Sequence, residues 1–331
     1  MPAQDPRLTE LGWNPFFSAQ LSPEEAASLC PVRVMAVHRG QIAVAGAGGS
    51  RLISPQIASA IAGEAYATVG DWLLINGETG QISRILGRAS LFQRRTPGNA
   101  RKLQLIAANV DTLFLVASCN QDFNLARLER YLVLAREAGV TPVIVLTKAD
   151  LTTTAEAFAE DARGLQPDLR VEIVNGKDPL SVAHLAAWCG PGKTVALLGS
   201  SGVGKSTLIN TLTGSGRIAT QAVREADGKG RHTTTVREMH RLDQGGWLID
   251  TPGMRELHLS EATEGLAEVF DDITLLAQHC RFSNCGHTKE PDCAVQAGLA
   301  DGTVDPTRFA RWRKLTTEDA ANASQNKRRP R

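Results

Sequence analysis

The chain has 331 residues, enough for two or three domains, and its 42% hydrophobic and 21% charged residues indicate a globular protein with a sizeable core. This composition excludes a disordered, collagen-like or coiled-coil chain. The formal net charge is only +1, so any nucleic-acid binding has to come from local patches. Apolar runs such as 112–117 are far shorter than the roughly 18 residues of a membrane span, and residues 1–14 lack a signal-peptide core. We therefore expect a cytoplasmic protein with no membrane partner.

The first 95 residues change pattern at about residue 31. Residues 1–30 predict a mobile tail and a short helix, because Ser22-Pro23-Glu24-Glu25 combines a capping residue, a first-turn proline and an acid three residues after the cap. Residues 31–95 predict a small OB-like barrel, because about five short β-like runs alternate with glycine-rich or polar turns. Fragments of a sandwich would give the same count. The five runs are 32–37, 41–45, 51–54, 71–75 and 81–86.

Charge is unevenly distributed along this part of the chain. Residues 31–110 contain nine Arg or Lys against three acids, a local balance of +6 in a nearly neutral protein. This asymmetry favours an electrostatic contact with a nucleic-acid backbone. A solvated basic face without a partner is the alternative interpretation.

Residues 96–262 predict an α/β domain, because strand-like and helix-like segments alternate there as in a doubly wound sheet. The segment 124–138 has leucines at helical spacing and predicts a core-facing helix. Residues 263–331 predict a mainly helical domain that ends in a basic tail, 322–331. The expected strands are 112–116, 143–146, 171–174, 194–198, 236–242 and 247–249.

A phosphate-binding loop is the clearest local motif. The run Gly199-Ser200-Ser201-Gly202-Val203-Gly204-Lys205-Ser206 is a complete GxxxxGK(S/T) pattern between an apolar strand and a helix-like stretch that begins at Thr207. In such a loop the backbone N–H groups face phosphate oxygens, Lys205 reaches the β- and γ-phosphates, and the Ser206 hydroxyl binds Mg²⁺. We therefore predict a nucleotide site formed by these residues and Thr207. A glycine-rich turn with no ligand is the weaker alternative.

Two shorter motifs complete a nucleotide site. Asp250-Thr251-Pro252-Gly253 follows an apolar stretch, where the aspartate can hold Mg²⁺ through water and the Gly253 N–H can sense the γ-phosphate. Thr147-Lys148-Ala149-Asp150 resembles the guanine-reading (N/T)KxD motif of GTPases. Asp150 can accept hydrogen bonds from the N1–H and the exocyclic amine of guanine, which adenine does not offer, so we expect GTP and not ATP. Thr147 stands where asparagine is commoner, and it can replace only part of the asparagine's bond to the phosphate loop.

The order of these motifs predicts a circularly permuted domain. An ordinary GTPase has the phosphate loop first and the base-reading motif last, whereas here Thr147–Asp150 precedes Gly199 by about fifty residues. The rearranged chain still assembles one crevice, because all of these loops leave the carboxyl ends of strands in one sheet.

The region between the phosphate loop and Asp250 predicts how water is activated. A threonine of Arg231-His232-Thr233-Thr234-Thr235 could complete the Mg²⁺ shell. Met254 occupies the position of the water-orienting glutamine of many GTPases, and methionine cannot polarise water, so intrinsic hydrolysis should be slow. His232 is the nearest suitable side chain, and a loop histidine without a catalytic role is the alternative.

Cys280-x4-Cys285-x-His287-x5-Cys293 predicts a closed, structural Zn²⁺ site of the Cys3His type. Buried cysteines without a metal are the alternative. His279 is a second candidate for the histidine ligand, but ligands at adjacent positions are sterically awkward.

Taken together, these residues resemble the RsgA/YjeQ family of circularly permuted GTPases that depend on the small ribosomal subunit. The similarity covers nearly the whole chain, and it includes Asp122-Phe123-Asn124-Leu125, Arg127-Leu128-Glu129-Arg130-Tyr131 and the run Gly230–Thr235. Val174-Asn175-Gly176-Lys177 lies at the distance of the family's guanine loop but lacks its usual Ser-Ala pair.

The resemblance implies a late-acting assembly factor that binds the small ribosomal subunit and its rRNA through the barrel and the zinc domain, and that hydrolyses GTP to GDP. It assigns Lys205 and Ser206 to phosphate and Mg²⁺, Thr234 to the switch threonine that completes the Mg²⁺ site, Asp150 to guanine, and His232 to the attacking water. We expect a monomer with one Zn²⁺. A P-loop ATPase or kinase, or an RNA-binding module that uses GTP only as a structural ligand, are the alternatives.

Overall fold

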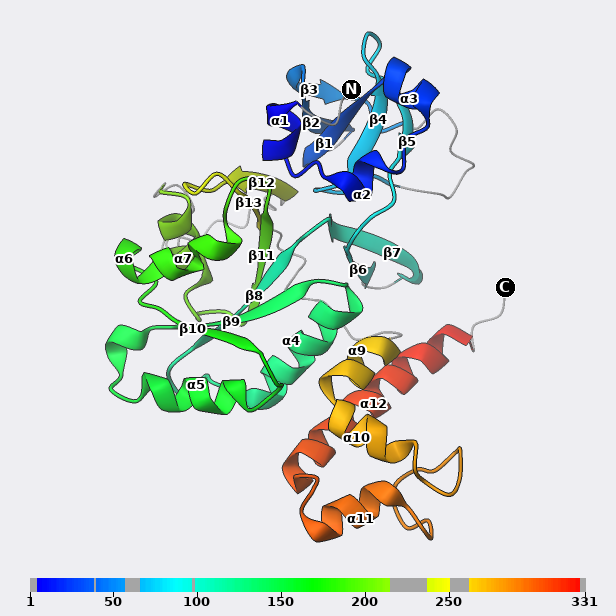
Figure 1. The fold of residues 1–331 in the computed structure, drawn as a ribbon, viewed down its shortest axis with the longest axis vertical. Helices are drawn as coiled ribbons and strands as arrows, with labels where there is room; N and C mark the ends of the chain where they lie inside the picture. Colours follow the sequence, from blue (N-terminus) through cyan, green and yellow to red (C-terminus); the bar gives the residue numbers. More distant parts are fainter. Residues whose placement is uncertain are drawn as a thin grey trace. The chain divides into compact units, whose positions relative to one another are not determined.

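The computed structural model describes residues 5–38, 40–56, 66–96, 99–214, 237–250 and 262–327. The chain forms two compact units (Figure 1). The first unit contains Met1–Phe123 and Ala138–Leu257, and the second contains Asn124–Glu137 and His258–Arg331. One helix from the middle of the sequence therefore belongs with the C-terminal part of the chain.

The N-terminal segment contains three short helices where the sequence predicted a tail and one helix. They are α1 (Pro6–Glu10), α2 (Pro15–Ser18) and α3 (Pro23–Ser28). Asp5, Asn14 and Ser22 each cap a helix whose first residue is proline. The capping box predicted at Ser22 and Glu25 is confirmed.

Aromatic burial explains why residues 5–21 are ordered. Trp13 and Phe17 are 4% and 3% exposed and pack against Trp72 of the barrel. The Trp13 and Trp72 rings meet edge to face with their centroids 4.8 Å apart. The prediction of a mobile tail is therefore wrong for these residues, because it overlooked large apolar side chains scattered between polar ones.

The five predicted strands of the barrel are present, and they fit the OB-like fold. Their order is β3-β2-β1-β4-β5, with antiparallel pairing throughout. Alternate apolar residues such as Val34, Val44 and Ile75 are fully buried between them. The strands are β1 (Leu29–His38), β2 (Gln41–Gly46), β3 (Gly49–Ile53), β4 (Trp72–Asn76) and β5 (Ile82–Ile85).

A two-stranded hairpin that the sequence analysis did not identify follows the barrel. It consists of β6 (Leu91–Thr96) and β7 (Asn99–Ala108), which pair with each other in a sheet of their own. The Pro97-Gly98 step between the two runs is a turn pattern that could have revealed it.

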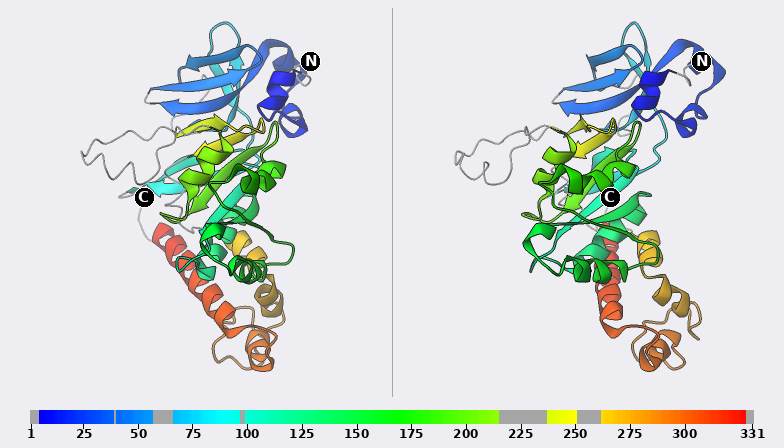
Figure 2. Two further views of the ribbon diagram at one scale, coloured as in Figure 1. Left: turned by 90° about the vertical axis from the view of Figure 1, so that its left-hand side faces the viewer. Right: turned by 60° about the vertical axis from the view of Figure 1, so that its left-hand side comes forward.

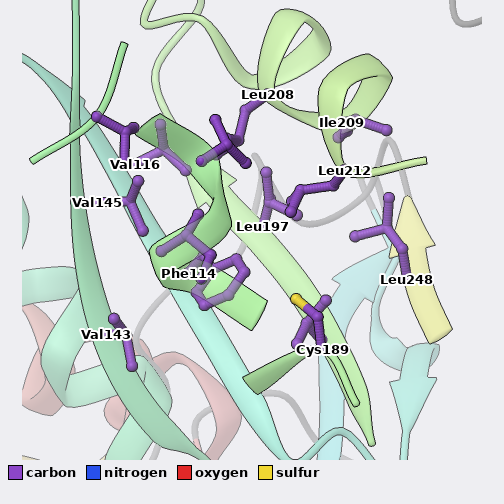
Figure 3. Packing of buried hydrophobic residues seen from close by; sticks show 14 of the residues in the cluster. Phe114, Val116, Val143, Val145, Cys189, Leu197, Leu208, Ile209, Leu212 and Leu248 are labelled. Carbon is purple, nitrogen blue, oxygen red and sulfur yellow. The ribbon is translucent and has the colours of Figure 1, made fainter. Parts of the chain in front are cut away.

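The α/β part of the first unit contains the six predicted strands. Their order is β10-β9-β8-β11-β13-β12, and all are parallel except β12, which runs antiparallel to β13. Leu208, Ile209 and Leu212 of helix α7 cover the sheet (Figure 3). The strands are β8 (Thr112–Ser118), β9 (Thr141–Thr147), β10 (Arg170–Ile173), β11 (Thr194–Gly199), β12 (Arg237–Arg241) and β13 (Trp247–Asp250). The helices of this part are η2 (Ala149–Leu151), α5 (Ala155–Arg163), α6 (Pro179–Val182), η3 (Ala183–Trp188) and α7 (Lys205–Leu212).

The barrel and the α/β part share one hydrogen-bonded sheet. Strand β1 pairs with β12 through Ala36 opposite Glu238 and Val37 opposite Arg237, and β12 lies beside the barrel strands in Figure 2. Arg33 reinforces this junction, since its buried guanidinium donates to the carbonyl oxygens of Leu11 (2.5 Å), Gly70 (3.4 Å) and Asn109 (3.0 Å). Burial lowers the pKa of Arg33 to about 10.

The second unit is helical, as predicted for the C-terminal region. It contains α4 (Leu125–Glu137), α9 (Thr263–Val269), α10 (Asp271–Ala277), α11 (Ala294–Asp301) and α12 (Pro306–Lys327). Helix α12 continues to Lys327, so it includes the first part of the basic tail expected at 322–331. None of the helices in the part of the chain that the structure describes is long and apolar enough to cross a membrane.

Candidate nucleotide and metal sites

The predicted nucleotide-binding loops leave one edge of the parallel sheet. Strands β9, β8 and β11 are neighbours, and β13 lies next to β11. The guanine-reading motif follows β9, the phosphate loop follows β11, and Asp250 is the last residue of β13. Because carboxyl ends of parallel strands meet at one edge, residues about fifty positions apart become neighbours. We call this group of loops the nucleotide edge.

The phosphate loop has the tight turn that its glycines predict. A Cβ on Gly199 would lie 2.4 Å from the carbonyl oxygen of Val116, so only glycine fits beside β8. Gly204 has a φ of +94°, in the left-handed region that favours glycine, and it directly precedes α7. Ser200, Ser201, Gly202 and Val203 form the turn between these two glycines.

Lys205 and Ser206 begin α7, where the unpaired N–H groups of the first turn attract anions. The Lys205 ammonium is buried and donates to the Gly199 carbonyl at 2.7 Å and to the Ser200 carbonyl. A bound phosphate would compete for the same three N–H donors. Thr207 follows in the first turn of the helix.

Thr147 connects the guanine-reading loop to the phosphate loop. Its hydroxyl oxygen lies 2.5 Å from the carbonyl oxygen of Val203 and 3.2 Å from that of Ala117. Thr147 is 1% exposed, so water cannot replace these acceptors. A hydroxyl has one proton, and the nearer Val203 carbonyl is its main acceptor. The bond fixes β9 to the loop that follows β11.

The two loops expected around guanine lie beside each other. Lys148 has a φ of +59°, and Asp150 lies exposed in the short helix η2. The Ala149 N–H donates to the Val174 carbonyl at 3.5 Å, which joins η2 to the loop after β10. Thr211 of α7 donates to the Gly176 carbonyl at 2.6 Å. Nothing in the local sequence around Thr211 predicts this long-range contact, so Thr211 was not among the expected site residues.

Several predicted residues lie outside the described part of the chain. These are His232, Thr234 and Gly253, together with Met254. Of Asp250 the structure describes the backbone, which pairs with Glu238 of β12.

The four predicted metal ligands come together in the second unit. The sulfur atoms of Cys280, Cys285 and Cys293 and a ring nitrogen of His287 all lie within 4.8 Å of one another. His279 is not part of this cluster. Burial disfavours the Cys280 thiolate, but hydrogen bonds from the backbone of Val295 and Ala294 and from the side chains of Cys293 and Cys285 together lower the pKa of Cys280.

The spacing of three of the four donor atoms, those of Cys280, Cys293 and His287, fits Zn²⁺. Tetrahedral zinc with Zn–S of about 2.3 Å and Zn–N of about 2.0–2.1 Å implies S–S edges of about 3.8 Å and S–N edges of about 3.5 Å. The Cys280 and Cys293 sulfurs are 3.8 Å apart, and each lies 3.5 Å from Nδ1 of His287. The donor set is therefore compatible with a zinc site.

Three further residues that the sequence analysis did not identify hold the histidine ligand in place. The Glu290 carboxylate accepts hydrogen bonds from the N–H groups of Gly286 (2.9 Å), Thr288 (2.7 Å) and Lys289 (3.0 Å), which surround His287. These donors, that of Thr288 foremost, lower the pKa of Glu290 to about 2. Gln296 donates to the His287 carbonyl at 2.6 Å, and the Trp312 ring lies 5.6 Å from the His287 ring.

The phosphate loop, the guanine-reading loop and their reversed order define a circularly permuted P-loop GTPase. The model of the RsgA GTPase family matches residues 85–260, slightly more than half of the chain. This chain therefore belongs to the RsgA GTPase family. Enzymes of this family hydrolyse GTP, which implies nucleotide and Mg²⁺ use.

Two curated relatives cover nearly the whole chain. A protein of Mesorhizobium japonicum is 52% identical over 97% of this chain and 92% of its own length. A protein of Vibrio vulnificus is 49% identical over 96% of this chain and 89% of its own length. They are named small ribosomal subunit biogenesis GTPase RsgA and RsgA 2, respectively.

Solved structures show the same architecture. YjeQ from Thermotoga maritima superposes with a TM-score of 0.64 at 24% identity, over 88% of this chain and 98% of that one. YloQ, described as a circularly permuted GTPase, superposes with a TM-score of 0.62 at 25% identity, over 92% of this chain and 97% of that one.

Proposed function

We propose that this GTPase acts in late maturation of the small ribosomal subunit, as the names of its relatives indicate for those proteins. The observation that carries the proposal is the bond between Thr147 and Val203, which links a guanine-reading loop to a phosphate loop. That arrangement supports GTP as the nucleotide, and the identity of 52% supports the same cellular role.

We assign the roles at the nucleotide edge by chemistry. Lys205 leaves its two carbonyl acceptors to bind the β- and γ-phosphates, and the N–H groups of the phosphate loop and of Ser206 and Thr207 bind the phosphate oxygens. Lys148 packs over the guanine ring, while Asp150 accepts hydrogen bonds from the N1–H and the exocyclic amine of guanine. Ser206, Thr234 and Asp250 would hold Mg²⁺, which when bound neutralises charge on the phosphates.

His232 would orient the attacking water, and the Gly253 N–H would detect the γ-phosphate. The motivation is Met254, whose side chain cannot polarise water at the position where many GTPases have glutamine. Hydrolysis then depends on bringing His232 into position, which we attribute to rRNA of the small subunit.

Binding to rRNA is assigned to two regions. Within the basic region 31–110, Arg33 is buried, and Arg84 and Arg88 pair with Glu25 and Asp71. The other Arg and Lys residues of this region would therefore contact phosphates of a nucleic-acid backbone. The second region is the helical domain, residues 263–331, which would be stabilised by one structural Zn²⁺ per chain. The ligands of this ion would be Cys280, Cys285, His287 and Cys293. We further propose that the protein acts as a monomer in the cytoplasm, with the barrel at 31–95 and the GTPase domain at 96–262.

GTP turnover with and without purified small ribosomal subunits tests the proposal. We expect slow turnover alone, strong stimulation by subunits, and competition by GDP but not by ATP. Binding of ATP as tight as that of GTP would favour an ATPase or kinase. Failure of subunits to stimulate phosphate release would overturn the proposed role and favour an RNA-binding module that uses GTP structurally.

A further inference from the structure

Helix α4 carries the run Arg127–Tyr131, whose chemistry the nucleotide edge does not use. This helix lies in the sequence between two strands of the first unit, yet it packs in the second unit with α9 and α12. Glu137 at its end accepts a hydrogen bond from the Gly265 N–H of α9 at 3.0 Å. Contacts with other helices of the second unit therefore hold α4 there.

Glu129 of α4 is fully buried and faces two arginines of α12. Its carboxylate lies 2.5 Å from Nε of Arg311 and 3.5 Å from Nη1 of Arg308. Burial raises the pKa of Glu129, while both guanidinium groups act in the opposite direction. Burying a charged carboxylate is costly unless it is paired and hydrogen-bonded, as Glu129 is.

Arg130, the next residue of α4, forms a second ion pair with α12. Its guanidinium donates two parallel hydrogen bonds to Glu318, one of them at 2.7 Å. Both side chains are a little over one quarter exposed, at 28% and 29%. Two adjacent residues of α4 thus bind three residues of α12, and we call these five the α4–α12 ion-pair cluster.

Helix α12 extends the cluster to the metal ligands. Trp312, one residue after Arg311, packs against His287 with ring centroids 5.6 Å apart. Arg308 also pairs with Asp272 of α10 at 2.9 Å and lies over the Phe270 ring at 4.9 Å. Helix α4 therefore contacts the same group of helices that packs against the Cys3His cluster.

The start of α4 is tied by the chain itself to the nucleotide edge. Ser118 at the end of β8 pairs with Thr147, and the Cys119 N–H donates to the Thr147 carbonyl at 3.0 Å. Thr147 in turn donates to Val203 of the phosphate loop. Residues 120–124 alone separate this group from the first residue of α4. A displacement of α4 would therefore also displace residues 119–124, the segment that borders Thr147.

From this arrangement we propose that Glu129 and Arg130 are positioning residues for stimulated GTP hydrolysis. By joining α4 to α12, they make the segment 119–124 respond when the zinc-bearing unit engages a polyanionic partner. This proposal rests on the proposed function, because it requires subunit-stimulated hydrolysis. A partner can change the conformation of the nucleotide edge only if it binds two conformations of the second unit with different affinities.

Reversal of the Arg130–Glu318 pair tests the proposal. Both side chains are partly exposed, so Arg130→Glu should fold. At saturating small subunits we expect its stimulated turnover to fall about tenfold, while basal turnover, GTP affinity and zinc content stay within about twofold of the wild type. The double variant Arg130→Glu with Glu318→Arg should recover stimulation to within about threefold, because it restores an ion pair of opposite polarity.

Arg136→Glu is the matched control. Arg136 lies on the same helix and forms an ion pair with Glu268 of α9 at 2.9 Å. Its stimulated turnover should stay within about twofold of the wild type. Amide hydrogen exchange at residues 119–124 provides a readout apart from activity, and it should become faster in Arg130→Glu and return towards the wild-type rate in the double variant.

A stimulated turnover of Arg130→Glu within twofold of the wild type, or equal losses of basal and stimulated turnover, overturns the role of the cluster while leaving the proposed function intact. The same holds if the double variant recovers nothing. A wild-type protein that small subunits do not stimulate overturns both proposals.

Discussion

At the nucleotide edge, Thr147 and Val203 are 56 residues apart in the chain, whereas the Cys280 and Cys293 ligands are separated by 13. The first site exists only after three parallel strands have paired, and a core that includes Phe114, Leu197 and Leu208 maintains it. The second site is set by a short loop and its local hydrogen bonds. Geometry at the nucleotide edge is thus a property of the sheet, while geometry at the Cys3His cluster is a property of one local segment.

Removal of one metal ligand should have the largest effect and leave the other site unchanged. Cys285→Ser opens the Cys3His set, and small zinc domains gain roughly 10–16 kcal/mol from the metal at neutral pH. We expect loss of bound zinc and of small-subunit binding, with unchanged GTP affinity. Metal analysis measures the bound zinc, and equilibrium binding of a fluorescent GTP analogue measures the nucleotide affinity. Full subunit affinity of metal-free protein would contradict this separation.

His232→Ala should have the next largest effect, and at the nucleotide edge alone. A correctly placed catalytic group in a GTPase contributes roughly 10³–10⁵ in rate, about 4–7 kcal/mol of barrier. We expect GTP binding and zinc content to be retained while most of the subunit stimulation is lost, as measured by phosphate release. A stimulated rate within about twofold of the wild type would exclude His232 from this role.

Thr147→Val sharpens the comparison by removing one hydroxyl from the nucleotide edge. The change keeps the shape of the side chain but leaves the buried Val203 carbonyl without its donor, which costs about 1–3 kcal/mol. GTP affinity should fall by roughly tenfold, with zinc content unaffected. Thr147→Ser is the matched control, since serine keeps the hydroxyl, and isothermal calorimetry compares the two. Equal affinities of the two variants would show that the bond does not contribute.

Glu290→Gln should have the smallest effect, confined to the Cys3His cluster. A glutamine has one acceptor oxygen, so it cannot satisfy all of the N–H groups that Glu290 binds around His287. Zinc should be lost to a chelator several-fold faster, and GTP affinity should not change. Glu264→Gln, an exposed acid of α9, serves as the control. A release rate equal to that of the control would show that the ligand loop does not need Glu290.

The same contrast explains what the sequence could predict. The phosphate loop and the four metal ligands are local patterns, so spacing alone located them. The contacts of Thr147 with Val203 and of Thr211 with Gly176 depend on strand order, which no local pattern contains. Likewise, leucine spacing predicted helix α4, but its long-range contacts with α9 and its ion pairs with α12 place it in the second unit.

The N-terminal helices show a different reason for failure. Trp13 and Phe17 lie among helices too short to build up a repeating pattern, yet Trp72 gives them a burial site. Periodicity therefore misses segments that are ordered by a few large side chains and short capped turns.

The pairing of β1 with β12 also constrains how the protein is made. Val37 finds its partner Arg237 only after two hundred further residues have been synthesised, which at about 5–20 residues per second takes roughly 10–40 s. Throughout that interval the barrel presents an unpaired strand edge, a template for wrong pairing with other nascent chains. The ribosome's own speed therefore sets how long each new molecule is vulnerable, and completion of the N-terminal barrel waits for the strand next to the nucleotide edge.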